Sequence, residues 1–192
     1  MQNVLHKEFY EKHDTLTLAK QLLGCTLVHN GIEGQTSGII VETEAYLKSD
    51  PACHAYRKKS ARNAPMFEGA GVSYVYLIYG LHHCFNIVSG AEGIGEAVLI
   101  RALEPTEGIE LMQERRKTKD LRNLCSGPAK LVQAMGITPH FNFLSLNSDK
   151  LYCLKPQNTD YQVITTTRIG ITQGVDLPYR FYIEGNRFVS RK

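Results

Sequence analysis

The sequence contains no apolar run close to the roughly 20 residues that are needed to cross a bilayer. Its first eight residues, Met-Gln-Asn-Val-Leu-His-Lys-Glu, lack the apolar core of a signal peptide and already carry charges. We therefore expect a cytoplasmic protein that makes no membrane contact. Internal repeats, low-complexity tracts and linker-like stretches are also missing. These absences indicate one domain over residues 1–192.

The cysteines are scattered along the chain, and their spacing favours neither a disulfide framework nor a metal site. The five cysteines are an odd number, and no two of them form a CxxC pair. The densest group of potential metal ligands is His82-His83-Cys84. Because adjacent strand residues point to opposite faces, these three side chains cannot easily converge on one ion. We therefore expect no metal site.

The net charge of +3 is too small to indicate a particular class of partner. Two local runs, residues 57–62 (Arg-Lys-Lys-Ser-Ala-Arg) and 115–119 (Arg-Arg-Lys-Thr-Lys), hold most of the clustered basic side chains. Such runs suit contact with phosphates, although either could be a hydrated loop.

Hydrophobic periodicity and turn residues predict an α+β fold. Helices are expected at 15–23, capped by Asp14 or Thr15, at 107–116, and at 126–136, capped by Ser126. Strands are expected at 25–29, 37–44, 74–78, 84–89, 97–102, 162–169 and 180–183. Turns are expected at Asn30-Gly31 and at 79–82. The pattern predicts a single compact domain with a curved, largely antiparallel β-sheet core and flanking helices. The polar stretch 48–71 is long for a connection and is therefore a candidate binding loop.

Two carboxylates occupy one face of the strand expected at 37–44. Glu42 and Glu44 point the same way because successive strand residues alternate, whereas Thr43 points to the other face. Buried without partners, two such charges are costly, so an edge strand with both acids in water is one interpretation. The other interpretation is a catalytic base at the end of a strand, with a cation nearby.

Arg101 raises a related question, because it stands inside the apolar segment Leu99-Ile-Arg-Ala102. An arginine in such a strand is rarely buried without a partner. Either it lies on the solvent face, or it pairs with a carboxylate such as Glu44. A guanidinium in that position would favour the ionised carboxylate and orient it.

Tyrosines repeat along residues 74–79 (Tyr-Val-Tyr-Leu-Ile-Tyr). A packed aromatic stripe in a strand is the ordinary interpretation of this repeat. Tyr79 differs, because it stands beside Gly80 at the expected hairpin tip, where an exposed ring contributes little to folding. Its position suits a ring that enters a stack of bases. Tyr46 and Tyr76 could then supply faces for a base flipped out of a duplex.

These segments belong to an ordered series that resembles the alkyladenine (3-methyladenine) DNA glycosylase family. The series covers most of the chain and comprises Val41-Glu-Thr-Glu-Ala-Tyr46, His54, Arg62-Asn63, Met66-Phe67, Tyr74-Val-Tyr-Leu-Ile-Tyr-Gly80, Cys84-Phe-Asn86, Arg101-Ala-Leu-Glu-Pro105, Leu124-Cys-Ser-Gly-Pro-Ala-Lys-Leu131 and Arg168-Ile-Gly170. The resemblance implies a single mixed domain that needs no metal or cofactor. It also implies a protruding β-hairpin that intercalates into DNA.

The resemblance also assigns roles to individual residues. Glu44 is expected to be the general base that activates water, with Arg101 beside it. The flipped purine is expected to be bound by Tyr46, His54 and Tyr76, with Asn86 at the floor of the pocket. Tyr79 is expected to fill the gap left in the duplex, while Arg62 and Lys58 contact the DNA backbone.

The implied reaction is base excision from double-stranded DNA that contains alkylated or deaminated purines, namely 3-methyladenine, 7-methylguanine, hypoxanthine or ethenoadenine, leaving an abasic site. We expect a monomer, associated with the nucleoid if the source is a prokaryote. The chain departs from the family pattern after Tyr46, where Leu-Lys-Ser-Asp-Pro stands, and at Arg57-Lys-Lys-Ser-Ala61. These changes bear on the range of lesions rather than on the reaction.

Two functions of other classes remain open at this point. A non-catalytic nucleic-acid-binding module could use the same basic loops and aromatic hairpin. Glu44 argues against it, because an acid in a phosphate-binding cleft is unfavourable unless it takes part in chemistry. A nucleoside hydrolase predicts a closed ribose pocket and no exposed wedge, so an exposed Tyr79 argues against it.

Overall fold

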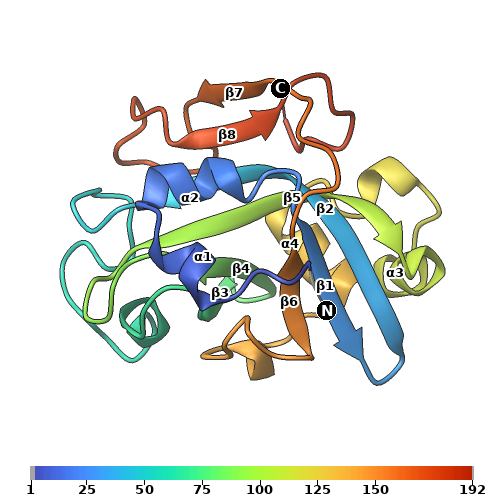
Figure 1. Cartoon of the computed structure of the whole chain (residues 1–192), viewed down its shortest axis with the longest axis horizontal. Coiled ribbons are helices and arrows are strands. Elements are labelled where there is room, and N and C mark those ends of the chain that lie inside the picture. The colour runs from blue at the N-terminus through green and yellow to red at the C-terminus, as the bar shows by residue number, and fades with distance from the viewer. Residues whose placement is uncertain (1–2, 192) are drawn as a thin grey trace.

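One eight-stranded antiparallel sheet organises the computed structural model, which describes residues 3–191 (Figure 1). Its main path runs β3-β4-β5-β2-β1-β6, while β8 pairs with both β2 and β7. The strands are β1 Thr26–Gly31, β2 Gly34–Tyr46, β3 Ser73–Ile78, β4 His82–Val88, β5 Ala97–Glu107, β6 Leu151–Leu154, β7 Val163–Thr166 and β8 Arg180–Ile183. The prediction of an α+β fold with a curved, largely antiparallel sheet is confirmed.

Within residues 3–191, four α-helices accompany the sheet, namely α1 Lys7–Glu11, α2 Thr15–Gln21, α3 Ile109–Arg116 and α4 Pro128–Met135. α2 packs on β2 through a hydrogen bond from the Thr43 hydroxyl to the carbonyl of Ala19, 2.8 Å long. Because side chains alternate along a strand, α2 covers the face of β2 that is opposite to Glu42 and Glu44. The face of β2 that carries Glu42 and Glu44 is therefore available for packing against elements other than α2.

The central position of β2 explains why its acidic segment is buried. Along one edge, β2 pairs with β5 over almost its full length. Along the other edge it pairs first with β1 and then, through residues 42–44, with β8. Glu42, Thr43 and Glu44 therefore have strands on both sides and are fully inaccessible to solvent. The edge-strand interpretation of this segment is wrong.

Local sequence explains where the second helix begins. The Asp14 carboxylate accepts a 2.8 Å hydrogen bond from the backbone nitrogen of Thr17, as expected for an N-cap. The chain leaves α2 through Gly24, whose φ of +78° places it in the left-handed region. The predicted start of this helix is confirmed, whereas its end lies at Gln21, two residues before the predicted end at residue 23.

Two predicted turn and cap positions are wrong. Asn30 and Gly31 belong to β1 and pair with Gln35 and Gly34, so the turn lies at residues 32–33. The Asn30 side chain instead donates to the carbonyl of Asp149, which explains its place in a strand. Ser126 does not cap α4, because it forms a β-bridge with Ala102. Gly127 takes the N-cap position without a side-chain hydrogen bond.

Several boundaries also differ from the prediction. β2 and β5 are longer than expected, and β5 continues through Glu107, where a helix was predicted to begin. β7 ends at Thr166, three residues before the predicted end at Ile169. Neither α1 nor β6 was predicted, because each is a segment of at most five residues without a clear period. Within residues 3–191, no helix is long and apolar enough to span a membrane.

Candidate active site

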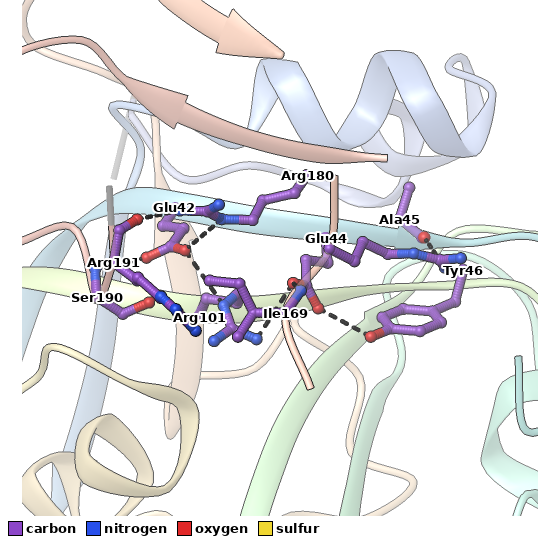
Figure 2. Close-up of polar contacts among 10 residues, drawn as sticks. Glu42, Glu44, Ala45, Tyr46, Arg101, Ile169, Arg180, Ser190 and Arg191 are labelled. Carbon is purple, nitrogen blue, oxygen red and sulfur yellow. Dashed lines mark hydrogen bonds and ion pairs between the residues drawn. The ribbon is translucent and has the colours of Figure 1, made fainter. Parts of the chain in front are cut away.

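A buried cluster of charges lies where β2, β5 and β8 meet (Figure 2). Arg101 of β5 reaches both acids of β2, with its Nε 3.2 Å from Glu42 Oε1 and its Nη1 3.2 Å from Glu44 Oε1. The arginine side chain is 9% exposed, and both glutamates are 0% exposed. The prediction that Arg101 pairs with a carboxylate is therefore confirmed.

Glu44 accepts hydrogen bonds from three directions. Besides Arg101, the backbone nitrogen of Ile169 donates to Oε1 at 2.8 Å, and the Tyr46 hydroxyl donates to Oε2 at 2.8 Å. Figure 2 shows these donors converging on the carboxylate from separate parts of the chain. A carboxylate offers about four lone-pair positions, so one position remains for a further donor such as water.

Glu42 has a different set of partners. It accepts from Arg101, from Arg180 Nε at 2.8 Å and from the backbone nitrogen of Ser190 at 2.7 Å. Arg180 belongs to β8, so this carboxylate joins β8 and the C-terminal segment to the sheet. The two acids share Arg101 but face different surroundings.

The protonation states of the neighbouring groups follow from their surroundings. Burial alone would lower the pKa of Arg101, but the charges of Glu44 and Glu42 outweigh it and raise this pKa. Burial, together with the charge of Glu44, raises the pKa of Tyr46 well above its usual value. Arg101 therefore stays a cation, and Tyr46 stays a hydrogen-bond donor.

A cavity of about 300 Å³ opens beside this cluster. This volume is at the lower end of the range for small-molecule pockets. Glu44 does not line the cavity itself, but all three of its hydrogen-bond donors do. The structure also places every predicted pocket residue and the predicted wedge in its wall, namely Tyr46, His54, Tyr76, Asn86 and Tyr79.

Aromatic rings form one wall of the cavity. The ring centroids of His54 and Tyr76 are 4.6 Å apart in an edge-to-face arrangement, and those of Tyr74 and Tyr76 are 5.2 Å apart. His54 lies exposed at the rim, where its Nδ1 is 2.9 Å from the Tyr74 hydroxyl. Partial burial of its ring against the cavity wall and the nearby charge of Arg62 lower the pKa of His54, which favours the neutral imidazole at neutral pH.

Asn86 and Cys84 lie in the adjoining part of the wall, on β4. The Asn86 side chain is 4% exposed, and its Nδ2 donates to the carbonyl of Tyr74 at 3.0 Å. This bond fixes the amide against the cavity. Burial raises the pKa of the Cys84 thiol, which therefore stays protonated.

Tyr79 stands at the tip of the hairpin formed by β3 and β4. Its φ is +52°, and the residue is 80% exposed. A bulky residue with positive φ is uncommon, and exposing its ring gains nothing for the core. Leu77 and Leu81 are also exposed beside it. The hairpin therefore presents apolar side chains to solvent next to the mouth of the cavity.

The two predicted DNA-backbone residues are exposed in the loop between β2 and β3. Arg62 donates to the carbonyl of Leu77 at 3.0 Å, and its guanidinium lies 5.7 Å from the centre of the Tyr76 ring. Asn63 holds this loop by donating to the carbonyls of His54 and Lys58. Contact of Arg62 and Lys58 with phosphates stays a prediction.

Sequence reasoning missed three contributors to the site. Ile169 acts through its backbone nitrogen, which no side-chain pattern reveals. Asp50 and Arg168 form a buried ion pair beside the cavity. The segment Arg168-Ile-Gly170 is part of the family resemblance, but the resemblance assigns no role to these residues. Within residues 3–191, no group of three or more His, Cys, Asp or Glu side chains could hold a metal ion.

Comparison with known proteins gives a consistent family assignment. The family model of methylpurine-DNA glycosylase matches residues 8–187. A relative from Methanoculleus marisnigri is 55% identical over 188 residues, covering 96% of this chain and 97% of its own. A relative from Carboxydothermus hydrogenoformans is 50% identical over 191 residues, covering 98% and 100%. Both carry the provisional name 3-methyladenine DNA glycosylase.

The position of Glu42 predicts a large loss of stability in Glu42→Gln. Three N–H donors approach the two oxygens of Glu42. In the glutamine variant the NH₂ group would face one of these donors, and the buried Arg101 and Arg180 would lose a negative charge that compensates theirs. We expect the free energy of unfolding to fall by about 3–5 kcal/mol, measured by urea denaturation. Glu33→Gln is the matched control, because Glu33 pairs with Arg115 but is 62% exposed. Glu33→Gln should lower the free energy of unfolding by at most about 1 kcal/mol. Equal small losses in both variants would contradict the structural role of Glu42.

Proposed function

This chain belongs to the methylpurine-DNA glycosylase family and is a DNA glycosylase, and we propose that it hydrolyses the bond between a damaged purine and its deoxyribose in double-stranded DNA. In this proposal the purine is flipped into the cavity, and Glu44 activates the attacking water. The candidate substrates are 3-methyladenine, which the relatives' names mention, 7-methylguanine, hypoxanthine and ethenoadenine. The product is an abasic site.

The observation that carries the proposal is a fully buried carboxylate, paired with a cation, immediately behind an aromatic cavity. Breaking an N-glycosidic bond develops positive charge on the sugar, so a fixed negative charge beside it stabilises the transition state. The same carboxylate can take a proton from water as the sugar is attacked. Arg101 supplies a positive charge 3.2 Å from this carboxylate and orients it.

The aromatic wall supports recognition of a flipped base. An alkylated purine is cationic, and a cation against aromatic faces gains roughly 0.5–2 kcal/mol. Flipping costs a few kcal/mol, and less for a damaged or mispaired base, which contributes to selectivity. A neutral lesion such as hypoxanthine additionally needs its leaving base to be protonated.

The hairpin tip supports recognition of the duplex. When a base leaves the stack, an inserted side chain can occupy the gap and keep the base from returning. Tyr79 is an exposed aromatic ring at the mouth of the cavity, and the exposed Arg62 and Lys58 lie in the adjoining loop. These positions suit insertion of the tyrosine into the minor groove, with the basic residues against the backbone.

We expect Glu44→Gln to retain binding of lesion-containing duplex but to lose base release by about 10²–10⁴-fold. The fold should persist, because Arg101 keeps its ion pair with Glu42 and the Tyr46 hydroxyl can rotate to accept a hydrogen bond from the new amide. The measurement is single-turnover release from duplexes that carry each of the four lesions, together with binding to the same duplexes. Release at nearly the native rate would remove Glu44 from the mechanism. Binding without release by the native protein would instead indicate a non-catalytic DNA-binding module.

Tyr79→Ala should weaken binding to a duplex that carries an abasic-site analogue by about 1–3 kcal/mol, the range for aromatic stacking on a base. Fluorescence anisotropy measures this change. Phe143→Ala is a matched control, because Phe143 is also aromatic, 50% exposed and at a positive φ of +66°, but does not line the cavity. Unchanged affinity in Tyr79→Ala, or equal losses in both variants, would exclude the tyrosine as the inserted residue.

A further inference from the structure

A second buried ion pair lies beside Tyr46. Asp50, in the loop after β2, and Arg168, two residues after β7, have side chains 1% and 0% exposed. Both guanidinium Nη atoms contact the carboxylate, and Nη1 also donates to the carbonyl of Ala45 at 3.0 Å. One arginine therefore ties the 168–174 segment both to the end of β2 and to the cavity loop. We call this pair the Asp50–Arg168 latch.

The latch touches the groups that hold Glu44. The Arg168 guanidinium lies 4.7 Å from the centre of the Tyr46 ring, whose hydroxyl donates to Glu44. Ile169 is the next residue in the chain, and its backbone nitrogen donates to Glu44. Ile169 lies beyond the end of β7, so no strand pairing fixes that nitrogen. Of the three donors to Glu44, one thus lies under the Arg168 guanidinium and another belongs to the residue that follows Arg168 in the chain.

The surrounding backbone fits closely around the latch. Gly174 has a φ of +59°, and its carbonyl accepts from Arg168 Nη2 at 3.4 Å. A Cβ at this position would lie 2.9 Å from Asp50 Oδ1 and 3.1 Å from Arg168 Nη2. A side chain at residue 174 would therefore press on the ion pair. The 168–174 segment therefore packs closely against this ion pair.

Stability alone does not account for such a pair. Removing two charges from water is costly, and apolar residues of similar volume are often equally stable in the same place. Burial alone would lower the pKa of Arg168, but its hydrogen bond to Asp50 and the charge of that carboxylate raise it. The guanidinium therefore remains charged, and it keeps its directional bonds to Asp50, to Ala45 and to Gly174 of its own segment. That geometry is the property that an apolar replacement would lack.

We propose that the Asp50–Arg168 latch positions the Tyr46 hydroxyl and the Ile169 N–H on Glu44, which makes Arg168 a positioning residue for the hydrolysis. This inference rests on the proposed role of Glu44 as the base. Misplacing a catalytic group by about 1 Å can cost about 10²-fold in rate, and residues that support a site from behind control displacements of that size. The latch is expected to act mainly on the reaction step, because the rings of Tyr74 and Tyr76 lie on β3 and pack against each other, away from Arg168 in the chain.

The test compares the native protein with the double variant Asp50→Asn/Arg168→Met. This variant removes both charges together, so no unpaired buried charge is left to unfold the chain. We expect single-turnover base release to fall about 10–100-fold, with affinity for an abasic-analogue duplex changed less than about 3-fold, a difference below 1 kcal/mol. Arg168→Lys retains the cation over Tyr46 and should recover part of the rate, although it loses the forked contact with Asp50.

Arg115→Lys supplies the matched control. Arg115 also bonds a carboxylate, that of Glu33, and a backbone carbonyl, that of Ala134, but it lies on α3 and does not line the cavity. It should release base at the native rate. Urea denaturation of all variants separates a loss of fold from a loss of rate.

A folded double variant that releases base at the native rate would overturn the latch and leave the proposed function intact. Parallel losses of rate, affinity and stability would also overturn it, because they indicate a purely structural pair. Failure of the native protein to release any base would overturn the proposed function and the latch together. Glu44→Gln, measured alongside, identifies which of these outcomes has occurred.

Discussion

The structure depends on the sharing of Arg101 between two buried carboxylates. Glu42 and Glu44 are inaccessible to solvent, and charges in such a place must be paired or the fold is lost. Arg101 bridges them from β5, and Arg180 from β8 balances the second negative charge. The cluster therefore holds β8 against the centre of the sheet. It also places the carboxylate of Glu44 behind a cavity, so the same contacts organise both the fold and the proposed chemistry.

Glu42 and Glu44 have identical side chains but different neighbours. Glu42 is surrounded by Arg101, Arg180 and the backbone of Ser190, none of which except Arg101 reaches the cavity. The donors to Glu44 all line that cavity. In the proposed mechanism the attacking water and the sugar reach Glu44 from the cavity that its donors line, whereas among the groups around Glu42 only Arg101 lines that cavity. This contrast supports a structural role for Glu42 and the proposed catalytic role for Glu44.

Much of this arrangement could be predicted from the sequence, because it follows from alternation and from isolated charges in apolar strands. The shared face of Glu42 and Glu44, a carboxylate partner for Arg101 and an exposed Tyr79 at a hairpin tip are of this kind. The resemblance added the pocket residues, which the structure gathers around one cavity. The Ile169 donor could not be predicted, since a backbone nitrogen has no sequence signature. Asp50 and Arg168 are 118 positions apart, so only the folded chain shows that they meet. Ser126 was misassigned as a cap because its pairing with Ala102 is equally non-local.

The most direct test of the account is a crystal structure of Glu44→Gln bound to a duplex that contains ethenoadenine. If the base is flipped into the cavity and Glu44 activates water, the damaged base will lie between Tyr46 on one side and the rings of His54 and Tyr76 on the other. The sugar C1′ will face residue 44, and the Tyr79 ring will occupy the gap left in the duplex. A lesion that remains stacked in the helix, or a flipped base bound with its sugar turned away from residue 44, would contradict the account.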